Sequence, residues 1–244
     1  MTHPLNVVRE FATDADYRAD PGFNFSTIKA AIGGSMSDLR HTLDNPPVWK
    51  PSPAMQLGTL VHEMCLEPAS VWVDKYAYTE ETDRRRKAYK EDKAEAEAAG
   101  KVLLSVDMKY KADGIVDACF RNPYFRGAMA ADNVSTEVGM ACTPMPVLLP
   151  GYRIKGKYDV LTDDSIMIDL KTTSEPLDID SLSRQIVNRN YHVQQALYWH
   201  ILRLVRPELA EHPTHMAWMF ARTEGALDTV YVVADDEMVA HAEA

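Results

Sequence analysis

Residues 152–171 read Tyr152-Arg-Ile-Lys-Gly-Lys-Tyr-Asp-Val-Leu-Thr-Asp-Asp-Ser-Ile-Met-Ile-Asp-Leu-Lys171. A short polar break at residues 162–165 separates two apolar stretches, which predicts two strands joined by a hairpin. Because residues i and i+2 of a strand point to the same face, Asp169 and Lys171 should emerge side by side. The hairpin brings Asp159 alongside them. The stretch therefore predicts two carboxylates suited to a hard divalent cation, with a lysine next to them.

The composition is that of an ordinary globular chain. It has 244 residues, of which 46% are hydrophobic and 25% charged, and this length can bury a sizeable core. No apolar run approaches the ~20 residues that span a bilayer, and residues 1–11 lack the apolar core of a signal peptide. We expect an irregular arm at residues 1–53, one globular domain at residues 54–244, and a cytoplasmic location without membrane contact.

The three cysteines, Cys65, Cys119 and Cys142, do not show C-x-x-C spacing. This argues against a disulfide framework, a structural zinc site and a cysteine-ligated iron–sulfur cluster. We expect three buried thiols.

The formal net charge of −10 weighs against nucleic-acid binding, because phosphate neutralisation supplies much of a protein's affinity for DNA. Local basicity can offset it. The densest cations are Arg84, Arg85, Arg86, Lys87 and Lys90. A sparser set comprises Arg184, Arg189, Arg203 and Arg206. A charge run is also typical of a solvated helix face, so the basic segment 84–90 has two open interpretations, a DNA contact and a solvated surface.

Apolar periodicity divides the chain into helical and strand-like parts. Helices are expected at residues 26–33, 54–67, 83–99 and 105–120. Strands follow at residues 134–142, 152–161 and 166–171 as an antiparallel meander. Helices return at 179–187 and 192–205, then strands at 214–221 and 229–234, with a short closing helix. This order predicts an α/β fold with a central mixed sheet flanked by helices.

Five short motifs follow one another between residues 54 and 205. They are Gly58-x3-His62-Glu63, Glu137, Gly156-x2-Asp159, Asp169-x-Lys171-Thr172-Thr173 and Tyr191-x2-Gln194-x3-Tyr198. In this order they resemble the PD-(D/E)xK nuclease superfamily, and within it the RecE-type phage exonucleases of the lambda-exonuclease and RecB-like fold. The basic segment is similar to an element of those proteins, although Tyr89 replaces their usual small residue. The resemblance implies a restriction-endonuclease-like core.

The resemblance also implies roles for the matched residues. Asp159 and Asp169 would ligate one or two Mg²⁺ or Mn²⁺ ions, with the Leu170 carbonyl as a further ligand. Lys171 would orient or deprotonate the attacking water and offset charge on the scissile phosphate. His62 would contribute a neutral imidazole nitrogen to the metal.

Three further side chains complete the expected site. The resemblance implies an acidic group near the metals at Glu137, although an exposed strand glutamate explains this residue equally well. Gln194 and Tyr198 are four residues apart and share a helix face, from which an amide and a phenol can reach a phosphate backbone. A zinc-protease H-E-x-x-H pattern is excluded, because Leu66 stands where its second histidine belongs.

Taken with the resemblance, the chain is expected to be a metal-dependent exodeoxyribonuclease that acts 5′-to-3′ on linear double-stranded DNA. Such enzymes leave 3′ single-stranded tails for a single-strand annealing protein in phage recombination, and relatives form ring-shaped homo-oligomers. The expected partners are therefore DNA ends, an annealing protein and further copies of the chain, in a bacterial cell that carries the phage or prophage. The alternatives are a PD-(D/E)xK endonuclease, a Cas4/RecB-like nuclease, a non-catalytic DNA-binding recombination accessory, and a metal-binding module without a nucleic-acid partner.

Overall fold

The computed structural model describes residues 8–32, 34–45, 50–143, 153–164, 166–209 and 215–235. Its helices are α1 (Asp14–Ala19), α2 (Phe25–Ile32), α3 (Met36–Asp44), α4 (Pro53–Leu66), α5 (Ala69–Trp72), α6 (Lys87–Ala98), α7 (Val106–Arg121), α8 (Pro123–Met129), α9 (Ile179–Asn188) and α10 (Tyr191–Val205), with a 3₁₀ turn at Val73–Lys75. Its strands are β1 (Val8–Glu10), β2 (Tyr76–Thr79), β3 (Val102–Ser105), β4 (Ser135–Cys142), β5 (Ile154–Leu161), β6 (Ile166–Thr173), β7 (His215–Arg222) and β8 (Thr229–Val233). None of the described helices is long and apolar enough to cross a bilayer.

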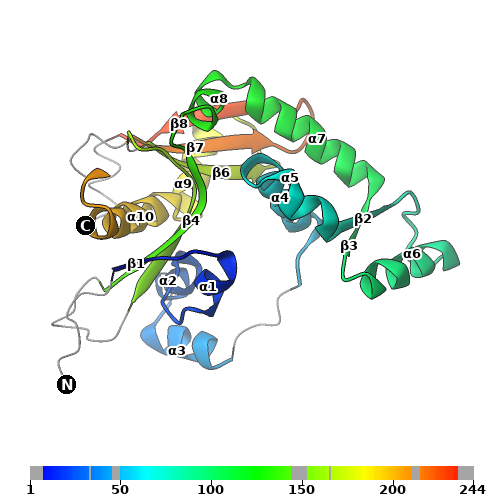
Figure 1. Ribbon diagram of the computed structural model, residues 1–244, viewed down its shortest axis with the longest axis horizontal. Coiled ribbons are helices and arrows are strands. Elements are labelled where there is room, and N and C mark those ends of the chain that lie inside the picture. The colour runs from blue at the N-terminus through cyan, green and yellow to red at the C-terminus, as the bar shows by residue number, and fades with distance from the viewer. Residues whose placement is uncertain are drawn as a thin grey trace.

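The central sheet has six strands in the order β1-β4-β5-β6-β7-β8. All neighbouring pairs are antiparallel except β6 and β7, which are parallel and are connected through α9 and α10 (Figure 1). The parallel pair requires this long crossover, whereas an antiparallel pair such as β5 and β6 can be joined by a hairpin. The expected mixed sheet flanked by helices is confirmed. A separate parallel pair, β2 with β3, carries α6 at one end of the molecule.

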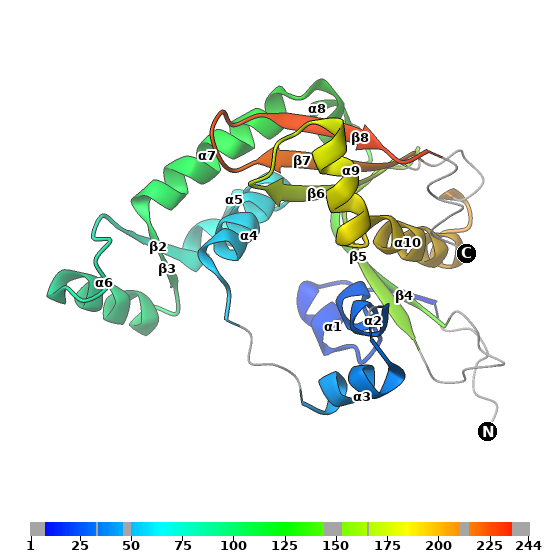
Figure 2. The ribbon, with the colours of Figure 1, turned by 180° about the vertical axis from the view of Figure 1, so that it is seen from behind.

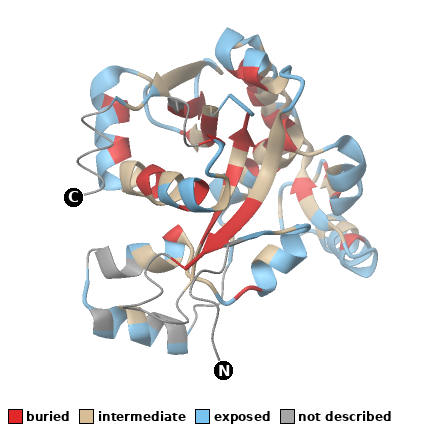
Figure 3. Ribbon diagram, turned by 60° about the vertical axis from the view of Figure 1, so that its left-hand side comes forward, coloured by how far each residue is buried: buried red, intermediate tan, exposed pale blue. Residues whose placement is uncertain are grey.

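Two helical layers cover the sheet. Helices α4 and α7 pack on one face, where Ile168 and Leu170 of β6 are buried against them. Helices α9 and α10 cover the other face, where Met167 of β6 and Trp218 of β7 are buried (Figure 2). Figure 3 shows the buried residues concentrated along the strands and on the inner sides of the helices. Burial of one such aliphatic side chain contributes about 1.5–3 kcal/mol.

The regular alternation of the strands breaks in β4 and β5 at neighbouring positions. In β5, Tyr158 packs in the α10 core but Val160, two residues later, packs in the α4–α7 core. In β4, Val138 packs against the α10 core, and the residue before it, Glu137, has a φ of 57°. A left-handed backbone is uncommon for a non-glycine residue and marks local strain of about 1–3 kcal/mol. The two strands therefore change layers together.

The described part of residues 1–53 is more regular than expected. Only the helix at residues 26–33 is anticipated by the sequence, whereas the structure adds β1, α1 and α3. Strand β1 extends the main sheet by pairing with β4, and Lys155 of β5 donates to the backbone carbonyls of Tyr17 and Asp20 at 2.7 and 2.6 Å. The expectation of an irregular arm is therefore wrong for the described residues, which form short helices and a strand docked on the sheet. A domain boundary near residue 53 stays a prediction.

The predicted helix at residues 83–99 is too long at its start. Helix α6 begins at Lys87, and residues 84–86 form a turn. The cause is Asp83, whose carboxylate accepts from the backbone N–H of Arg85 at 3.0 Å and also binds its guanidinium. Such a local bond offers the backbone an alternative to the helix. The structure also adds β2, β3, α5 and α8, and the predicted closing helix lies outside the described residues.

Candidate metal centre

Helix α4 carries His62 to the sheet. The Ser52 hydroxyl caps the helix by accepting from the Met55 N–H, and Pro53 occupies the first turn. Gly58 allows a close approach to β6, because a Cβ at this position would lie 3.0 Å from Thr172 Oγ1. The glycine four residues before the histidine therefore brings one turn of α4 against the strand that contains Asp169 and Lys171.

His62, Glu137 and Asp159 form the metal-type cluster that is found among the described residues. One ligand atom from each lies within 4.8 Å of the other two, and His62 Nδ1 is 3.7 Å from Asp159 Oδ2. The strand register explains the pairing of the carboxylates. Thr136 is opposite Val160 and Val138 is opposite Tyr158, so Glu137 and Asp159 face each other.

Asp159 is fixed by the backbone of the next strand. Its Oδ2 accepts from the Leu170 N–H at 2.8 Å, at a point beyond the last paired residues of β5 and β6, Val160 with Ile168. The carboxylate thus satisfies an amide that would otherwise need a ladder partner. The Leu170 carbonyl, expected as a metal ligand, accepts a hydrogen bond from His62, so it lies at the same cluster.

Asp169 and Lys171 point to the same side of β6, as the alternation predicts. Lys171 Nζ is 2.5 Å from Asp169 Oδ2 and 4.7 Å from the centre of the Tyr191 ring. Gln194 of α10 joins them, because its amide donates to Asp169 and accepts from Lys171, each at 3.3 Å. Asp169 is not one of the three clustered ligands, and its role as a metal ligand stays a prediction.

Tyr198 lies one turn after Gln194 and bonds to it. Its ring packs on Gly156, where a Cβ would come within 2.8 Å of Tyr198 Cδ1. Gly156 is therefore needed because the Tyr198 ring of α10 leaves no space for a side chain at this position. Gln195, the next residue of α10, is buried and donates to the Ala217 carbonyl of β7 at 3.0 Å.

The ionisable groups of the site have shifted pKa values. Burial and the nearby Asp169 raise the pKa of Asp159 to about 7, and burial and Asp159 raise that of Glu137 despite a lysine partner. Burial and the charge on Lys171 lower the pKa of His62, which favours neutral imidazole. Burial alone would lower the pKa of Lys171, but Asp169 and Asp159 outweigh it and raise the pKa. Lys171 is therefore held as an ammonium.

A cleft of about 930 Å³ opens onto the cluster, and His62, Glu137 and Asp159 line it. Further lining comes from Asp14 and Arg18 of α1 and from Lys111, Arg189 and Glu224. Asp169, Lys171, Gln194 and Tyr198 are not part of the lining. They lie behind the cluster on the α10 side of the sheet.

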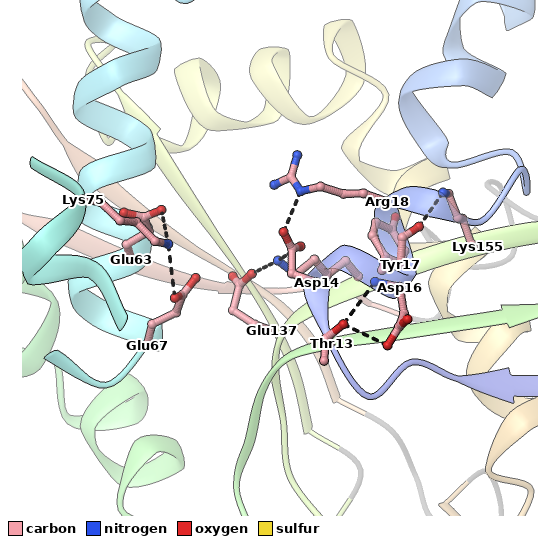
Figure 4. A network of polar contacts seen from close by, with 11 residues as sticks. Thr13, Asp14, Asp16, Tyr17, Arg18, Glu63, Glu67, Lys75, Glu137 and Lys155 are labelled. Carbon is pink, nitrogen blue, oxygen red and sulfur yellow. Dashed lines mark hydrogen bonds and ion pairs between the residues drawn. The ribbon is translucent and has the colours of Figure 1, made fainter. Parts of the chain in front are cut away.

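Two residues of this region are missed by the sequence reasoning. Lys157 forms ion pairs with Glu137 and, at 2.9 Å, with Asp14, and Figure 4 shows Asp14 beside Glu137. Lys157 lies two residues before Asp159 and on the same strand face, so alternation could have found it. Asp14 has no local signal, because only the docking of α1 on the sheet brings it here.

Glu63 belongs to an ion-pair group rather than to the metal-type cluster. Its carboxylate accepts from Lys75 at 3.0 Å and from the Tyr76 hydroxyl at 2.7 Å, and Figure 4 shows this group apart from Glu137. The three cysteines are free and buried, which confirms that prediction.

The basic segment 84–90 is not part of the cleft lining. Arg85 pairs with Asp83 and Arg86 with Glu81 at 3.1 Å, while Lys87 pairs with Glu91 at 3.4 Å. These side chains lie around the start of α6, at the end of the molecule that carries β2 and β3 (Figure 1). Their contact with DNA stays a prediction.

The donor set suits a hard divalent cation. Burial and a neighbouring carboxylate raise the pKa of both Glu137 and Asp159, the neighbour being Asp159 for Glu137 and Asp169 for Asp159. With the neutral imidazole of His62 beside them, they offer oxygen and nitrogen ligands whose cost of ionisation a bound cation would relieve. The residues present therefore fit a Mg²⁺- or Mn²⁺-type ion.

A mixed sheet between two helical layers, with Asp159 on one strand and the Asp169-x-Lys171 triplet on the next, defines a PD-(D/E)xK-type fold. The chain belongs to the family described as "PDDEXK-like domain of unknown function (DUF3799)", which matches residues 26–242. The superfamily and fold expected from the sequence are confirmed.

One solved structure supports the fold. The chain is similar to a crystal structure of a protein from Eubacterium rectale described as "Putative exonuclease", with a TM-score of 0.63 and 16% identity over 96% of this chain and 81% of that one. A structure of the protein SSO0001 matches with a TM-score of 0.30 and 16% identity over 80% of this chain and 84% of that one. No curated protein matches the sequence.

Proposed function

We propose that this chain is a metal-dependent deoxyribonuclease that acts as a 5′-to-3′ exonuclease on linear double-stranded DNA. The observation that carries the proposal is the convergence of His62, Glu137 and Asp159 on an open cleft, with the Asp169–Lys171 pair directly behind them. A structural ion pair would explain Asp169 and Lys171 alone. It would not explain three further ligand-type groups gathered at the same place.

The proposed cofactor is Mg²⁺ or Mn²⁺, as one or two ions. His62, Glu137 and Asp159 would hold the first, with Asp169 and the Leu170 carbonyl as additional ligands. When bound, the ion supplies Lewis-acid polarisation of the scissile phosphate and acidifies water. The neutral state of His62, which follows from its lowered pKa, leaves a ring nitrogen free to coordinate.

Lys171 would act through its charge. Its raised pKa keeps the ammonium protonated at neutral pH, so it is suited to orient water and to offset charge on the phosphate rather than to accept a proton. Gln194 is hydrogen-bonded to both Lys171 and Asp169 and would therefore hold the two side chains in place relative to each other. Tyr198 bonds to Gln194 and supports it from the next turn of α10.

The substrate assignment rests on the cleft and on the family. The cleft lining includes the cations Arg18, Lys111 and Arg189. Arg18 and Lys111 are paired with Asp14 and Glu224, so a DNA phosphate would have to replace these carboxylates. The basic segment 84–90 would extend the contact along the duplex. The 5′-to-3′ polarity, the release of 3′ tails to an annealing protein, the ring-shaped oligomer and the phage or prophage setting in a bacterial cytoplasm are proposed from the sequence resemblance.

Two substrates test this function. With Mg²⁺ or Mn²⁺ the protein should degrade linear duplex DNA and leave covalently closed circles intact, and chelation should stop the reaction. Cutting of circles would indicate an endonuclease instead, and binding without cutting would indicate a recombination accessory. For polarity, duplexes blocked at either the 5′ or the 3′ ends should be compared. Protection by 5′ blocks is expected, and equal attack on both would remove the polarity assignment.

A further inference from the structure

Four charged side chains alternate in sign from α1 to the metal-type cluster. Arg18 pairs with Asp14 at 2.5 Å, Asp14 pairs with Lys157 at 2.9 Å, and Lys157 pairs with Glu137. Figure 4 shows Arg18, Asp14 and Glu137 in this succession. The Lys157 ammonium therefore lies between two carboxylates that come from elements far apart in sequence, and one of them belongs to the cluster.

This position places Lys157 in competition with a metal ion. A divalent cation held by Glu137 and Asp159 would lie close to the Lys157 ammonium, and two positive charges at such a separation repel each other. The side chain of Lys157 is 22% exposed, so solvent weakens this repulsion without removing it. Glu137 cannot serve both cations equally well.

Asp14 offers the ammonium a second place. It is held rigidly, because α1 is docked through two bonds from Lys155 to the carbonyls of Tyr17 and Asp20. Tyr17 also packs on Gly139 of β4, where a Cβ would lie 2.9 Å from its ring. Asp14 therefore remains beside Lys157 whether or not Glu137 is engaged by an ion.

We propose that Lys157 is a built-in counter-cation of the metal centre: it pairs with both Glu137 and Asp14 in the metal-free protein, and it releases Glu137 and keeps its contact with Asp14 when a divalent ion binds. This inference rests on the proposed function and deepens it, because it assigns α1 a part in setting metal affinity. Lys157 and Asp14 are positioning residues in this scheme. They act on the ion through Glu137.

The scheme predicts effects of opposite sign for two residues that bond to each other. Lys157→Met removes the competing charge, so Mn²⁺ should bind roughly tenfold more tightly. Asp14→Asn removes the alternative partner, so Lys157 stays on Glu137 and Mn²⁺ should bind several-fold more weakly. Lys157→Arg keeps the charge and should restore an affinity near that of the unmodified protein.

The measurement is calorimetric titration of metal-free full-length protein with Mn²⁺, without DNA. Asp16→Asn is the matched control on α1, because Asp16 bonds to Thr13 and does not contact Lys157. This control should leave the affinity within about twofold, and Asp14→Asn should lose most of its effect when Lys157 is already Met.

The outcomes separate the two proposals. If the unmodified protein does not bind Mn²⁺, the proposed function fails and this inference fails with it. If the unmodified protein binds Mn²⁺ but Lys157→Met and Asp14→Asn both weaken binding, the salt bridges only hold α1 in place and the inference alone is overturned. Opposite shifts with the coupling described above support it.

Discussion

Leu170 donates its backbone N–H to Asp159 Oδ2 at 2.8 Å, across the point where β5 and β6 cease to pair. A ligand carboxylate thus replaces one rung of the sheet. This arrangement orients Asp159 toward His62 through the backbone, which is stiffer than any side chain. It also couples the folding of the hairpin to the geometry of the candidate metal centre.

This bond predicts different outcomes for two substitutions at one position. Asp159→Asn keeps an oxygen that can accept from Leu170, whereas Asp159→Ala leaves the amide without its partner. We expect the alanine variant to be about 1–3 kcal/mol less stable than the asparagine variant, because Leu170 is fully buried. Urea unfolding of both variants without metal measures this difference. Equal free energies of unfolding would mean that this hydrogen bond does not stabilise the fold.

The raised pKa of Asp159 predicts a pH-dependent cost in the metal-free protein. A carboxyl whose folded pKa is about 7, against about 3.8 unfolded, binds more protons when folded. The free energy that this carboxyl costs the folded state is absent below about pH 4, grows between about pH 4 and pH 7, and is complete above about pH 7. The stability of Asp159→Asn relative to the unmodified protein should therefore rise between pH 5 and pH 8 in a chelating buffer. A constant or falling difference would contradict the shift.

The contact between Gly156 and Tyr198 predicts a compensating pair. Gly156→Ala would place a methyl group 2.8 Å from Tyr198 Cδ1, in a ring that is held by its neighbours. We expect a loss of about 1–3 kcal/mol from this overpacking. In a Tyr198→Ala background the same substitution should cost much less, since the ring is gone. A double-mutant cycle measures the coupling, and additive losses would show that the ring is not what excludes a side chain at Gly156.

Gln194 and Gln195 are adjacent in α10 but predict opposite phenotypes. Gln194 contacts Lys171 and Asp169, so Gln194→Ala should lower nuclease turnover at least tenfold with a small change in stability. Gln195 bonds to the Ala217 carbonyl in the core, so Gln195→Met should cost about 1–2 kcal/mol and leave turnover of the folded protein nearly unchanged. Turnover and urea unfolding should be measured on both. The reverse pattern would exchange their roles.

Local pattern accounts for the centre of the fold. The alternation of residues 152–171 predicts the hairpin and the shared face of Asp169 and Lys171, and helical spacing predicts the shared face of Gln194 and Tyr198. These predictions succeed because they depend on the backbone period alone. The resemblance adds His62, which no local signal distinguishes from a core histidine.

Long-range docking accounts for what pattern does not show. The break in alternation at Glu137 comes from a left-handed backbone in a strand, and no residue type at that position announces it. Asp14 and Lys157, which are 143 residues apart in sequence, meet because β1 joins the sheet through β4. The turn at residues 84–86 departs from the predicted helix because the Asp83 side chain accepts from the Arg85 N–H and so favours a turn, although its charge also suits a helix.

The most direct test of the central claim is the rate at which Lys171→Ala degrades linear duplex DNA in Mg²⁺. Circular dichroism and urea unfolding should first establish that the variant is folded. The account predicts a fall of about 10²–10⁴-fold in turnover, because the ammonium held beside Asp169 is lost. Undiminished cleavage by the folded variant would contradict the nuclease centre described for this chain.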